Sequence, residues 1–280
     1  RREAKDDAPS CVVARRNRRE LAVAFDEPPP DWVTEGRVVL ELEPSSVTHD
    51  RLKLALRRMK DDKAGARWHA VLSEQAPRFN ERPRSPPLQK QSLNPEQCAA
   101  LDLCERAEEL ALGHGPPGTG KTTVLVEVIR AAVARGEKVI ASAPSNLAVD
   151  NLVERLAAAG IDAVRIGHPA RVLPSVIAHT LEMRTRAHES ARIASDLMEE
   201  AISLRRSAAK RKSKRGPGRF SQSREQWREA RSLVNEARAL QDRAQAEVLD
   251  RAPVILATLT GLESRALGGR GFALAVVDEA

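Results

Sequence analysis

Residues 115–122 combine the residue types that hold a phosphate group, since they read Gly-Pro-Pro-Gly-Thr-Gly-Lys-Thr and match G-x-x-x-x-G-K-[ST]. Glycines let backbone N–H groups turn inward around phosphate oxygens, and a helix that begins here adds the positive end of its dipole. Lys121 is expected to reach the β- and γ-phosphates, and Thr122 to hold Mg²⁺. We therefore expect ATP and Mg²⁺ as cofactors. The predicted nucleotide contacts in this loop are Gly115, Pro116, Pro117, Gly118, Thr119, Gly120, Lys121, Thr122 and Thr123.

Two acids follow an apolar run near the end of the sequence, where Val276 and Val277 precede Asp278 and Glu279. An apolar strand that ends here places Asp278 beside the metal and lets Glu279 polarise an attacking water. Many strands end in acids, so the pattern is informative only because a phosphate-binding loop accompanies it. We predict Lys121, Asp278 and Glu279 as catalytic residues, and Thr122 with Asp278 as Mg²⁺ ligands.

Alternating helix and strand patterns surround these two motifs. Helices are expected over 95–109, 121–135 and 148–159, the last two closed by Gly136 and Gly160. Strands are expected over 110–114, 138–142, 163–166, 253–257 and 273–277. Continuous apolar strands suit a parallel sheet buried on both faces, so the fold class is α/β, an incomplete P-loop NTPase sheet.

A different pattern interrupts this α/β region over residues 176–249. Alanine and leucine recur there at spacings of three and four on both sides of Gly-Pro-Gly at 216–218. This predicts an inserted antiparallel helical hairpin with a narrow seam. Its tip carries eight basic residues without an acid between them, more than the chain's whole net charge of +7: Arg205, Arg206, Lys210, Arg211, Lys212, Lys214, Arg215 and Arg219. The run is either a solvated loop or a contact to nucleic-acid phosphates, and Arg211, Lys212, Lys214 and Arg215 are the predicted contacts in the second case.

The first part of the chain indicates a smaller accessory region. Residues 11–14, 21–25 and 37–42 have strand character, with a turn at Asn17, and indicate the end of a partial N-terminal β-barrel. An amphipathic helix is expected over 47–59, and a linker or surface loop over 77–93. The expected domains are a partial barrel at 1–46, a stalk helix and linker at 47–85, and an ATPase domain at 86–280 that contains the hairpin insertion at 176–250.

Composition excludes several other classes of protein. No run of 18 apolar residues is present, so no membrane span is expected. Three cysteines lack metal-ligand spacing and favour a reducing, cytoplasmic location. Aromatic residues make up only 2% of the chain, so base stacking is not expected to dominate any grip on nucleic acid. The chain begins with Arg1 rather than Met, which suggests an internal piece of a longer protein.

Read together, the motifs resemble superfamily 1B, Upf-like helicases, closest to the immunoglobulin-µ-binding-protein type. The resemblance covers nearly the whole chain. The similar segments are Leu-Asn-Pro-Glu-Gln at 93–97 (Q motif), 115–123 (motif I), Ala-Pro-Ser-Asn-Leu-Ala-Val-Asp-Asn-Leu at 143–152 (motif Ia), the blocks at 165–171 and 256–261, and Val-Asp-Glu-Ala at 277–280 (motif II). Motif Ia is the most specific of these, since the same phosphate-binding loop also suits AAA+ proteins.

The resemblance implies further roles. Gln97 would contact the adenine edge, because an amide can bond the N6/N7 pair of adenine. Ser145, Asn146 and Thr258 would bind the nucleic-acid backbone, although turn formation and helix capping are equally compatible roles. His168 and Arg171 are weaker candidates. The family also places arginines that contact the γ-phosphate in the rest of the first RecA-like domain and in a second one, expected beyond Ala280, so this chain alone is not expected to hydrolyse ATP at a useful rate.

The interpretation is therefore a partial, RecA-like, ATP-dependent 5′→3′ helicase or translocase that acts on single-stranded DNA or RNA. One alternative is an AAA+ remodelling ATPase, which usually has its two ATP-site motifs closer together than Lys121 and Asp278. A second alternative is a non-catalytic nucleic-acid-binding module. The sequence indicates neither the oligomeric state nor the protein partners.

Overall fold

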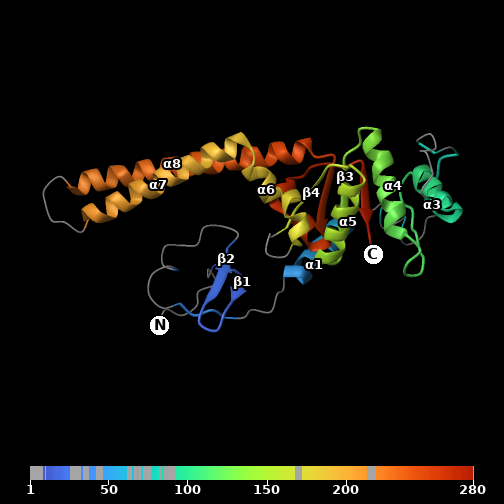
Figure 1. The fold of residues 1–280 in the computed structure, drawn as a ribbon, viewed down its shortest axis with the longest axis horizontal. Helices are drawn as coiled ribbons and strands as arrows, with labels where there is room; N and C mark the ends of the chain where they lie inside the picture. The colour runs from blue at the N-terminus through green and yellow to red at the C-terminus, as the bar shows by residue number, and fades with distance from the viewer. Residues whose placement is uncertain are drawn as a thin grey trace. The chain divides into compact units, whose positions relative to one another are not determined.

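The computed structural model describes residues 9, 11–25, 33, 38–41, 47–61, 65, 68, 71, 77–81, 83–84, 93–167, 172–212 and 219–279. The chain divides into two compact units, at 1–50 and 51–280 (Figure 1). Within the described ranges, no helix is both long enough and apolar enough to cross a membrane.

The first unit contains a two-stranded antiparallel hairpin. Strands β1 (Val12–Arg16) and β2 (Leu21–Ala24) pair with an irregularity between Val13 and Arg15. The turn closes where the N–H of Asn17 donates to the carbonyl of Glu20 over 2.8 Å, as the sequence predicts. A third strand was predicted over 37–42. For the residues described there, 38–41, this prediction is wrong, because they are not in a strand. Val39 is 83% exposed, and none of these four residues pairs with a described strand. The complete partial barrel stays a prediction.

The second unit is built on a four-stranded parallel sheet, as predicted. Its strands are β3 (Val139–Ala143), β4 (Ala163–Arg165), β5 (Val254–Thr258) and β6 (Leu274–Val277), in the order β4-β5-β3-β6. Helices α4 (Lys121–Ala134) and α5 (Asn146–Ala158) cover one face. Both end as expected, with Gly136 at φ 78° and Gly160 at φ 73°, because a left-handed residue after a helix lets the chain turn away.

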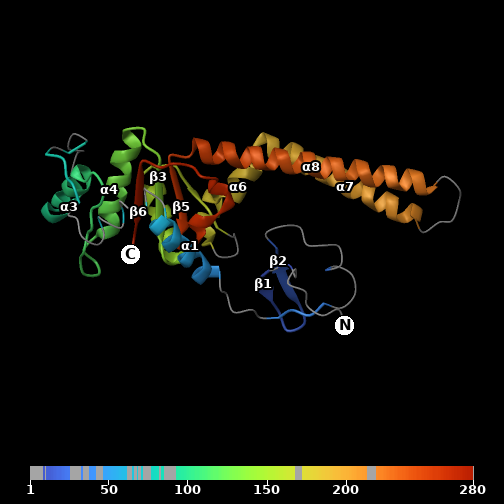
Figure 2. The ribbon, with the colours of Figure 1, turned by 180° about the vertical axis from the view of Figure 1, so that it is seen from behind.

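Fully buried aliphatic side chains fill both faces of the sheet. Ile129 of α4 and Leu152 of α5 pack over Leu256 of β5 on the first face. On the second face, Ile255 packs with Leu249 and with residues around α6 (Leu181–Arg186). Figure 2, which is turned by 180° from Figure 1, looks toward this second face. Burial of apolar surface contributes about 25 cal/mol per Å² to stability. The burial on both faces therefore holds the carboxyl ends of the strands in a fixed arrangement.

Strand β6 departs from the expected burial. It pairs only with β3 among the described strands, and Val277 is 42% exposed. The segment before the phosphate-binding loop is also not the predicted strand, since residues 110–114 are irregular. A strand needs a neighbour whose N–H and C=O groups complete its ladder, and none of the described strands pairs with this segment. Apolar composition alone therefore overestimated the extent of the sheet.

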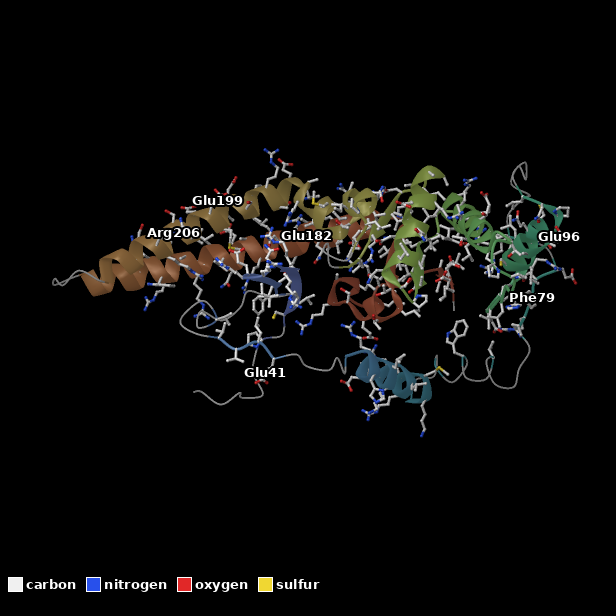
Figure 3. All side chains as sticks on the ribbon, turned by 60° about the horizontal axis from the view of Figure 1, so that its bottom comes forward. Glu41, Phe79, Glu96, Glu182, Glu199 and Arg206 are labelled. Atoms are coloured by element: carbon white, nitrogen blue, oxygen red, sulfur yellow. The ribbon has the colours of Figure 1, made fainter. Side chains whose placement is uncertain are left out.

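The inserted hairpin is confirmed and consists of α7 (Glu189–Lys212) and α8 (Arg219–Arg251). In Figure 1 the pair extends away from the sheet, and α8 alone is about 50 Å long at about 1.5 Å per residue. Its seam consists of alanines that are 0% exposed and recur every seven residues: Ala194, Ala201, Ala208, Ala230, Ala237 and Ala244. Small seam residues let the two backbones pack closely. Glu199 and Arg206 point outward from this seam (Figure 3).

Helix α3 (Pro95–Arg106) ends three residues before the predicted boundary, and the preceding segment explains this. The segment predicted as a linker or surface loop, at 77–93, includes Phe79, which forms an antiparallel bridge with Ala107. The N–H of Asn80 donates to the Arg106 carbonyl over 2.7 Å, and the N–H of Arg84 donates to the Glu105 carbonyl over 3.2 Å. These contacts satisfy carbonyls at the helix end that have no partner within the helix.

A charged cluster joins the end of α3 to the end of α4. Arg135 bonds Glu105 over 2.6 Å and Glu137 over 2.9 Å. The hydrogen bond from Arg135 lowers the pKa of Glu137, and the bond to Glu137 is the main cause that raises the pKa of Arg135. Burial raises the pKa of the Cys104 thiol on α3, with the neighbouring Glu105 charge as a second cause. This cluster fixes α3 against the helix that follows the phosphate-binding loop.

Shorter helical segments are also present among the described residues of the second unit. They are 3-10 helices at Pro174–His179, Leu259–Glu263 and Arg265–Leu267. Helix α1 (Val47–Asp61) confirms the expected amphipathic helix, and its portion in this unit contacts the second of these segments. Arg51 donates to the Thr260 carbonyl, and Arg58 pairs with Glu263 over 3.0 Å.

Candidate functional site

The phosphate-binding loop forms a turn that leads directly into α4. Gly118 and Gly120 both have φ 84°, a region that residues with a Cβ rarely adopt. The hydroxyl of Thr119 closes the turn by donating to the Pro116 carbonyl over 2.9 Å. No side chain caps the N-terminus of α4. Its first backbone N–H groups therefore remain available to an anion, which the helix dipole also favours.

Lys121 lies over its own loop. Its ammonium group donates to the Gly115 carbonyl over 2.8 Å and to the Pro116 carbonyl over 3.1 Å. An ammonium carries three N–H groups, so one donor remains beyond these two contacts. The side chain is exposed, and phosphate oxygens are stronger acceptors for it than neutral carbonyls. The loop thus holds a cation next to the uncapped helix end.

Thr122 and Asp278 meet although 156 positions separate them. The Thr122 hydroxyl donates to Oδ2 of Asp278 over 3.0 Å, and Asp278 is only 7% exposed. The N–H of Asp278 donates to the Ser142 carbonyl over 2.9 Å, which extends the β3–β6 pairing to the acid. Hydroxyl and carboxylate oxygens are the hard ligands that Mg²⁺ takes from proteins. The oxygens of Thr122 and Asp278 therefore fit the metal that accompanies a nucleoside triphosphate.

Glu279 follows in a left-handed conformation with φ 57°, which is uncommon for a residue with a Cβ. Its N–H donates to Oδ1 of Asp278 over 3.1 Å, so both oxygens of that carboxylate are fixed. The Glu279 side chain itself is exposed at the end of β6. The backbone of Glu279 therefore lies beside Asp278, and its catalytic role stays a prediction.

Gln97 connects α3 to the phosphate-binding loop. Its side-chain oxygen accepts from the Asn94 N–H over 3.0 Å, and Asn94 in turn accepts from the Gln97 N–H over 2.8 Å. This reciprocal pair is a capping box at the start of α3. The Gln97 amide nitrogen donates to the Thr119 carbonyl over 3.0 Å. One amide N–H and one lone pair therefore remain for an adenine edge.

The candidate nucleic-acid residues lie at the carboxyl edge of the same sheet. Ser145 follows β3 and Thr258 ends β5, and the register pairs Ala143 with Thr258. The Ser145 hydroxyl accepts from the Ala148 N–H over 3.1 Å, and the Thr258 hydroxyl accepts from the Gly261 N–H over 3.2 Å. The Ser145 hydroxyl keeps its own O–H for donation, and the Thr258 hydroxyl also lies 3.4 Å from the Thr260 hydroxyl, where either group can donate. The capping roles and a contact to phosphate are therefore compatible.

Asn146 belongs to a buried network that the sequence analysis did not identify. The guanidinium of Arg165 donates to Oδ1 of Asn146 over 2.7 Å and to Oδ1 of Asp150 over 2.9 Å. Arg165 and Asp150 each have 1% side-chain exposure. The available signal was a charged residue inside the apolar strand at 163–166, because such a residue needs a partner when it is buried.

The remaining predicted residues are less informative. Arg211 and Lys212 lie in the last turn of α7, and their side chains are outside the described residues, as are Lys214, Arg215, His168 and Arg171 entirely. Within the described ranges, no group of three or more His, Cys, Asp or Glu residues could hold a metal ion. The tip of the hairpin therefore stays a prediction, and Thr122 and Asp278 remain the candidate ligands of Mg²⁺.

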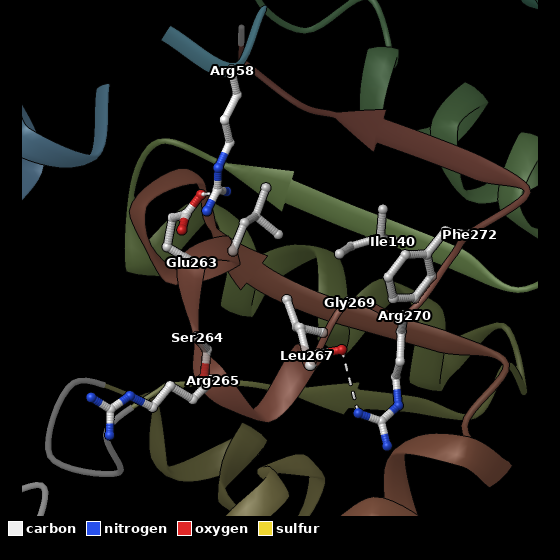
Figure 4. Close-up of a pocket in the computed structure, with 11 residues that line it drawn as sticks. Arg58, Ile140, Glu263, Ser264, Arg265, Leu267, Gly269, Arg270 and Phe272 are labelled. Atoms are coloured by element: carbon white, nitrogen blue, oxygen red, sulfur yellow. Dashed lines mark hydrogen bonds and ion pairs between the residues drawn. The ribbon is translucent and has the colours of Figure 1, made fainter. Parts of the chain in front are cut away.

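A surface groove of about 510 Å³ lies on the second face of the sheet (Figure 4). Arg58 and Glu263 face each other at one end, and Ile140 and Phe272 line its apolar part. No residue of the phosphate-binding loop or of the acid pair lines it. The groove is therefore separate from the nucleotide site.

The glycine-rich loop leads into α4, and the acid that it contacts follows β6 of the parallel sheet. This combination defines a P-loop NTPase. The predicted α/β fold class is confirmed. The chain belongs to the family described as "AAA domain", which matches residues 92–280.

Curated relatives carry helicase and DNA-binding names. The "DNA polymerase alpha-associated DNA helicase A" of Schizosaccharomyces pombe is 37% identical over 188 residues, which cover 67% of this chain and 28% of that protein. The "DNA-binding protein SMUBP-2" of Mus musculus is 36% identical over 281 residues, covering 96% of this chain and 27% of that protein. An "Uncharacterized ATP-dependent helicase" of Methanocaldococcus jannaschii is 31% identical over 296 residues, which cover 92% of this chain and 44% of that protein.

The resemblance to superfamily 1B, Upf-like helicases is confirmed by this family match and by these relatives. The chain spans about a quarter of the length of the first two relatives and less than half of the third. Its similarity to SMUBP-2 includes the first unit and the hairpin, since the match covers 96% of the chain.

Proposed function

We propose that this chain is the nucleotide-binding part of an ATP-dependent helicase or translocase that moves 5′→3′ along a single strand. The contact between Thr122 and Asp278 carries the proposal, because it joins the phosphate-binding loop to the acid at the end of β6. The names of the relatives favour DNA as the strand, with RNA as the alternative. ATP and Mg²⁺ would be the cofactors, and we propose the cytoplasm as the location, which the sparse cysteines favour.

The described side chains support distinct roles in this function. Lys121 would neutralise charge on the β- and γ-phosphates, and the uncapped N–H groups of α4 would hold their oxygens. Thr122 and Asp278 would hold Mg²⁺, which supplies further charge neutralisation at the phosphates when bound. Glu279 would orient the attacking water through its exposed carboxylate. Gln97 would contribute an adenine contact.

We further propose that residues 86–280 form the first RecA-like domain, with the hairpin as an insertion at 176–250 and with 1–46 and 47–85 as accessory parts. Ser145, Asn146 and Thr258 would grip the sugar–phosphate backbone at the carboxyl edge of the sheet. Strand β3 pairs with β5, which ends at Thr258, and with β6, which leads to Asp278, so β3 links the two sites. Movement of the nucleic acid would follow when ATP binding changes this grip. An AAA+ remodelling enzyme would lack this second site.

The proposal is tested by titrating the chain with a fluorescent ATP analogue, with and without Mg²⁺. We expect Mg²⁺ to tighten binding, and Asp278→Asn to make this gain about tenfold smaller, because the change removes a carboxylate ligand of the metal. Asp162→Asn is the control, because Asp162 pairs with Arg184 away from the loop. A Mg²⁺ gain that persists in Asp278→Asn would contradict the metal assignment. A fluorescein-labelled single strand that fails to bind would favour the AAA+ alternative.

The basic hairpin tip gives a separate prediction about binding of the strand. If about four of the eight charges contact phosphates, replacing all eight with glutamine should reduce the slope of log K against log salt by about 3, at about 0.7 per contact. No sequence preference should change, because such contacts do not read bases. The control replaces Arg228, Arg231 and Arg238 with glutamine, which are exposed on α8 outside the tip. An unchanged slope in the tip variant would leave the run as a solvated loop.

A further inference from the structure

Arg165 is a cation held almost entirely out of water at the end of β4. Its Nε donates to Oδ1 of Asp150 over 2.9 Å, its Nη1 to the Ile166 carbonyl over 2.5 Å, and its Nη2 to Oδ1 of Asn146 over 2.7 Å. A buried guanidinium needs such partners, because an unpaired charge in the interior is strongly unfavourable. All three N atoms of the side chain are therefore engaged, each by a different residue.

This arrangement determines which way the Asn146 amide faces. A guanidinium has only donors, so it must meet the amide oxygen and not the amide nitrogen. The NH₂ group of Asn146 then faces away from Arg165, with two donors still to be satisfied. The neighbouring Ser145 hydroxyl accepts from the Ala148 N–H and keeps its own O–H. Two adjacent side chains at the start of α5 thus present donors, the complement of sugar–phosphate oxygens.

The same network reaches a second segment of chain. Oδ2 of Asp150 accepts from the Leu173 N–H over 2.8 Å, so the carboxylate joins Arg165 to the chain that follows β4. At Gly167 a Cβ would lie 1.8 Å from Nη1 of Arg165, which shows how closely the backbone wraps the guanidinium. Arg165 is consequently held from three sides, and rotation of its tip away from Asn146 would break several contacts together.

We propose that Arg165 is a positioning residue for single-strand binding, which fixes the donor face of the Asn146 amide toward the nucleic-acid backbone. The inference rests on the proposed function, because it assumes that this edge of the sheet binds a strand. A lysine at position 165 could keep the charge near Asp150, but its single nitrogen cannot serve the three partners that the guanidinium fork serves.

A double-mutant cycle separates positioning from simple structural support. We expect Asn146→Ala to weaken binding of a labelled single-stranded DNA about tenfold, and Arg165→Lys about fivefold. If Arg165 acts through Asn146, the double variant should be weakened about tenfold and not about fiftyfold, because the second change has nothing left to misplace. Affinity for the ATP analogue should stay within about twofold in all three variants.

The outcomes of this cycle are distinguishable. Additive effects on single-strand binding would overturn the inference and leave Arg165 a structural residue. If the unaltered chain binds no single strand at low salt, the proposed function itself fails. Arg184→Lys is the matched control, since Arg184 also bonds an aspartate through two nitrogens but lies on α6. Should Arg165→Lys fail to fold, Gly167→Ala displaces Nη1 while keeping the guanidinium, and the same non-additivity with Asn146→Ala is expected.

Discussion

Replacing Lys121 with alanine is expected to weaken binding of a fluorescent ATP analogue by at least about 100-fold, which would abolish it in practice. Lys121 is the cation of the loop, and charge-assisted hydrogen bonds to phosphate contribute about 1.5–3 kcal/mol each. The measurement is an anisotropy titration with Mg²⁺ at constant ionic strength. Equal affinity in the variant and the unaltered chain would show that residues 115–122 do not bind the nucleotide.

Lys121 also holds the loop through the Gly115 and Pro116 carbonyls, so loss of the side chain could act on loop shape as well as on charge. Lys121→Gln separates the two effects, since an amide can still donate to a carbonyl but carries no charge. We expect this variant to bind as poorly as Lys121→Ala. Lys138→Ala is the matched control, because the Lys138 ammonium also donates to a backbone carbonyl, that of Asp250, over 2.6 Å. Its affinity for the analogue should be unchanged.

The parts of the fold that the sequence predicted are those with strong local signals. Alanine and leucine at spacings of three and four predict a helical hairpin with a narrow seam, and glycines at 136 and 160 mark the ends of α4 and α5. Continuous apolar runs predict β3 and β5, which are buried as expected. These features depend on residues within one turn or one strand, so periodicity is enough to find them.

Non-local contacts decide the features that the sequence did not predict. Residues 110–114 have strand composition, but whether they form a strand depends on a neighbouring strand. Residues 78–84 have the composition of a linker, yet their backbone completes the end of α3 through Asn80 and Arg84. In each case the deciding hydrogen bonds join distant parts of the chain, and composition carries no record of them.

The candidate site shows the same division. The loop at 115–122 and the acids at 278–279 have recognisable spacing, and the structure brings Thr122 and Asp278 together. The contact between Gln97 and Thr119 depends on how α3 packs against α4, which no spacing rule provides. Arg165 was visible as a charge in an apolar strand, but its partners Asp150 and Asn146 precede it by 15 and 19 positions.

Removing the partner of this buried arginine is expected to give the largest loss of stability. Asp150→Ala should lower the free energy of unfolding by about 3–5 kcal/mol, because it leaves the Arg165 cation in the interior without a counter-charge. The Leu173 N–H would lose its acceptor as well. Urea unfolding followed by circular dichroism at 222 nm measures this change, with the slope m as a check that the same surface unfolds.

Two further variants make the origin of that loss clear. Asp162→Ala removes the carboxylate of the Arg184 pair, whose two side chains are 27% and 54% exposed, and should cost only about 0–1 kcal/mol because water screens the charges. Replacing both buried partners together, Asp150→Leu with Arg165→Met, should recover much of the loss, since apolar side chains of similar volume remove the unpaired charge. If the double variant is as unstable as Asp150→Ala, the cost arises from lost hydrogen bonds to Asn146, Ile166 and Leu173 and not from the isolated cation.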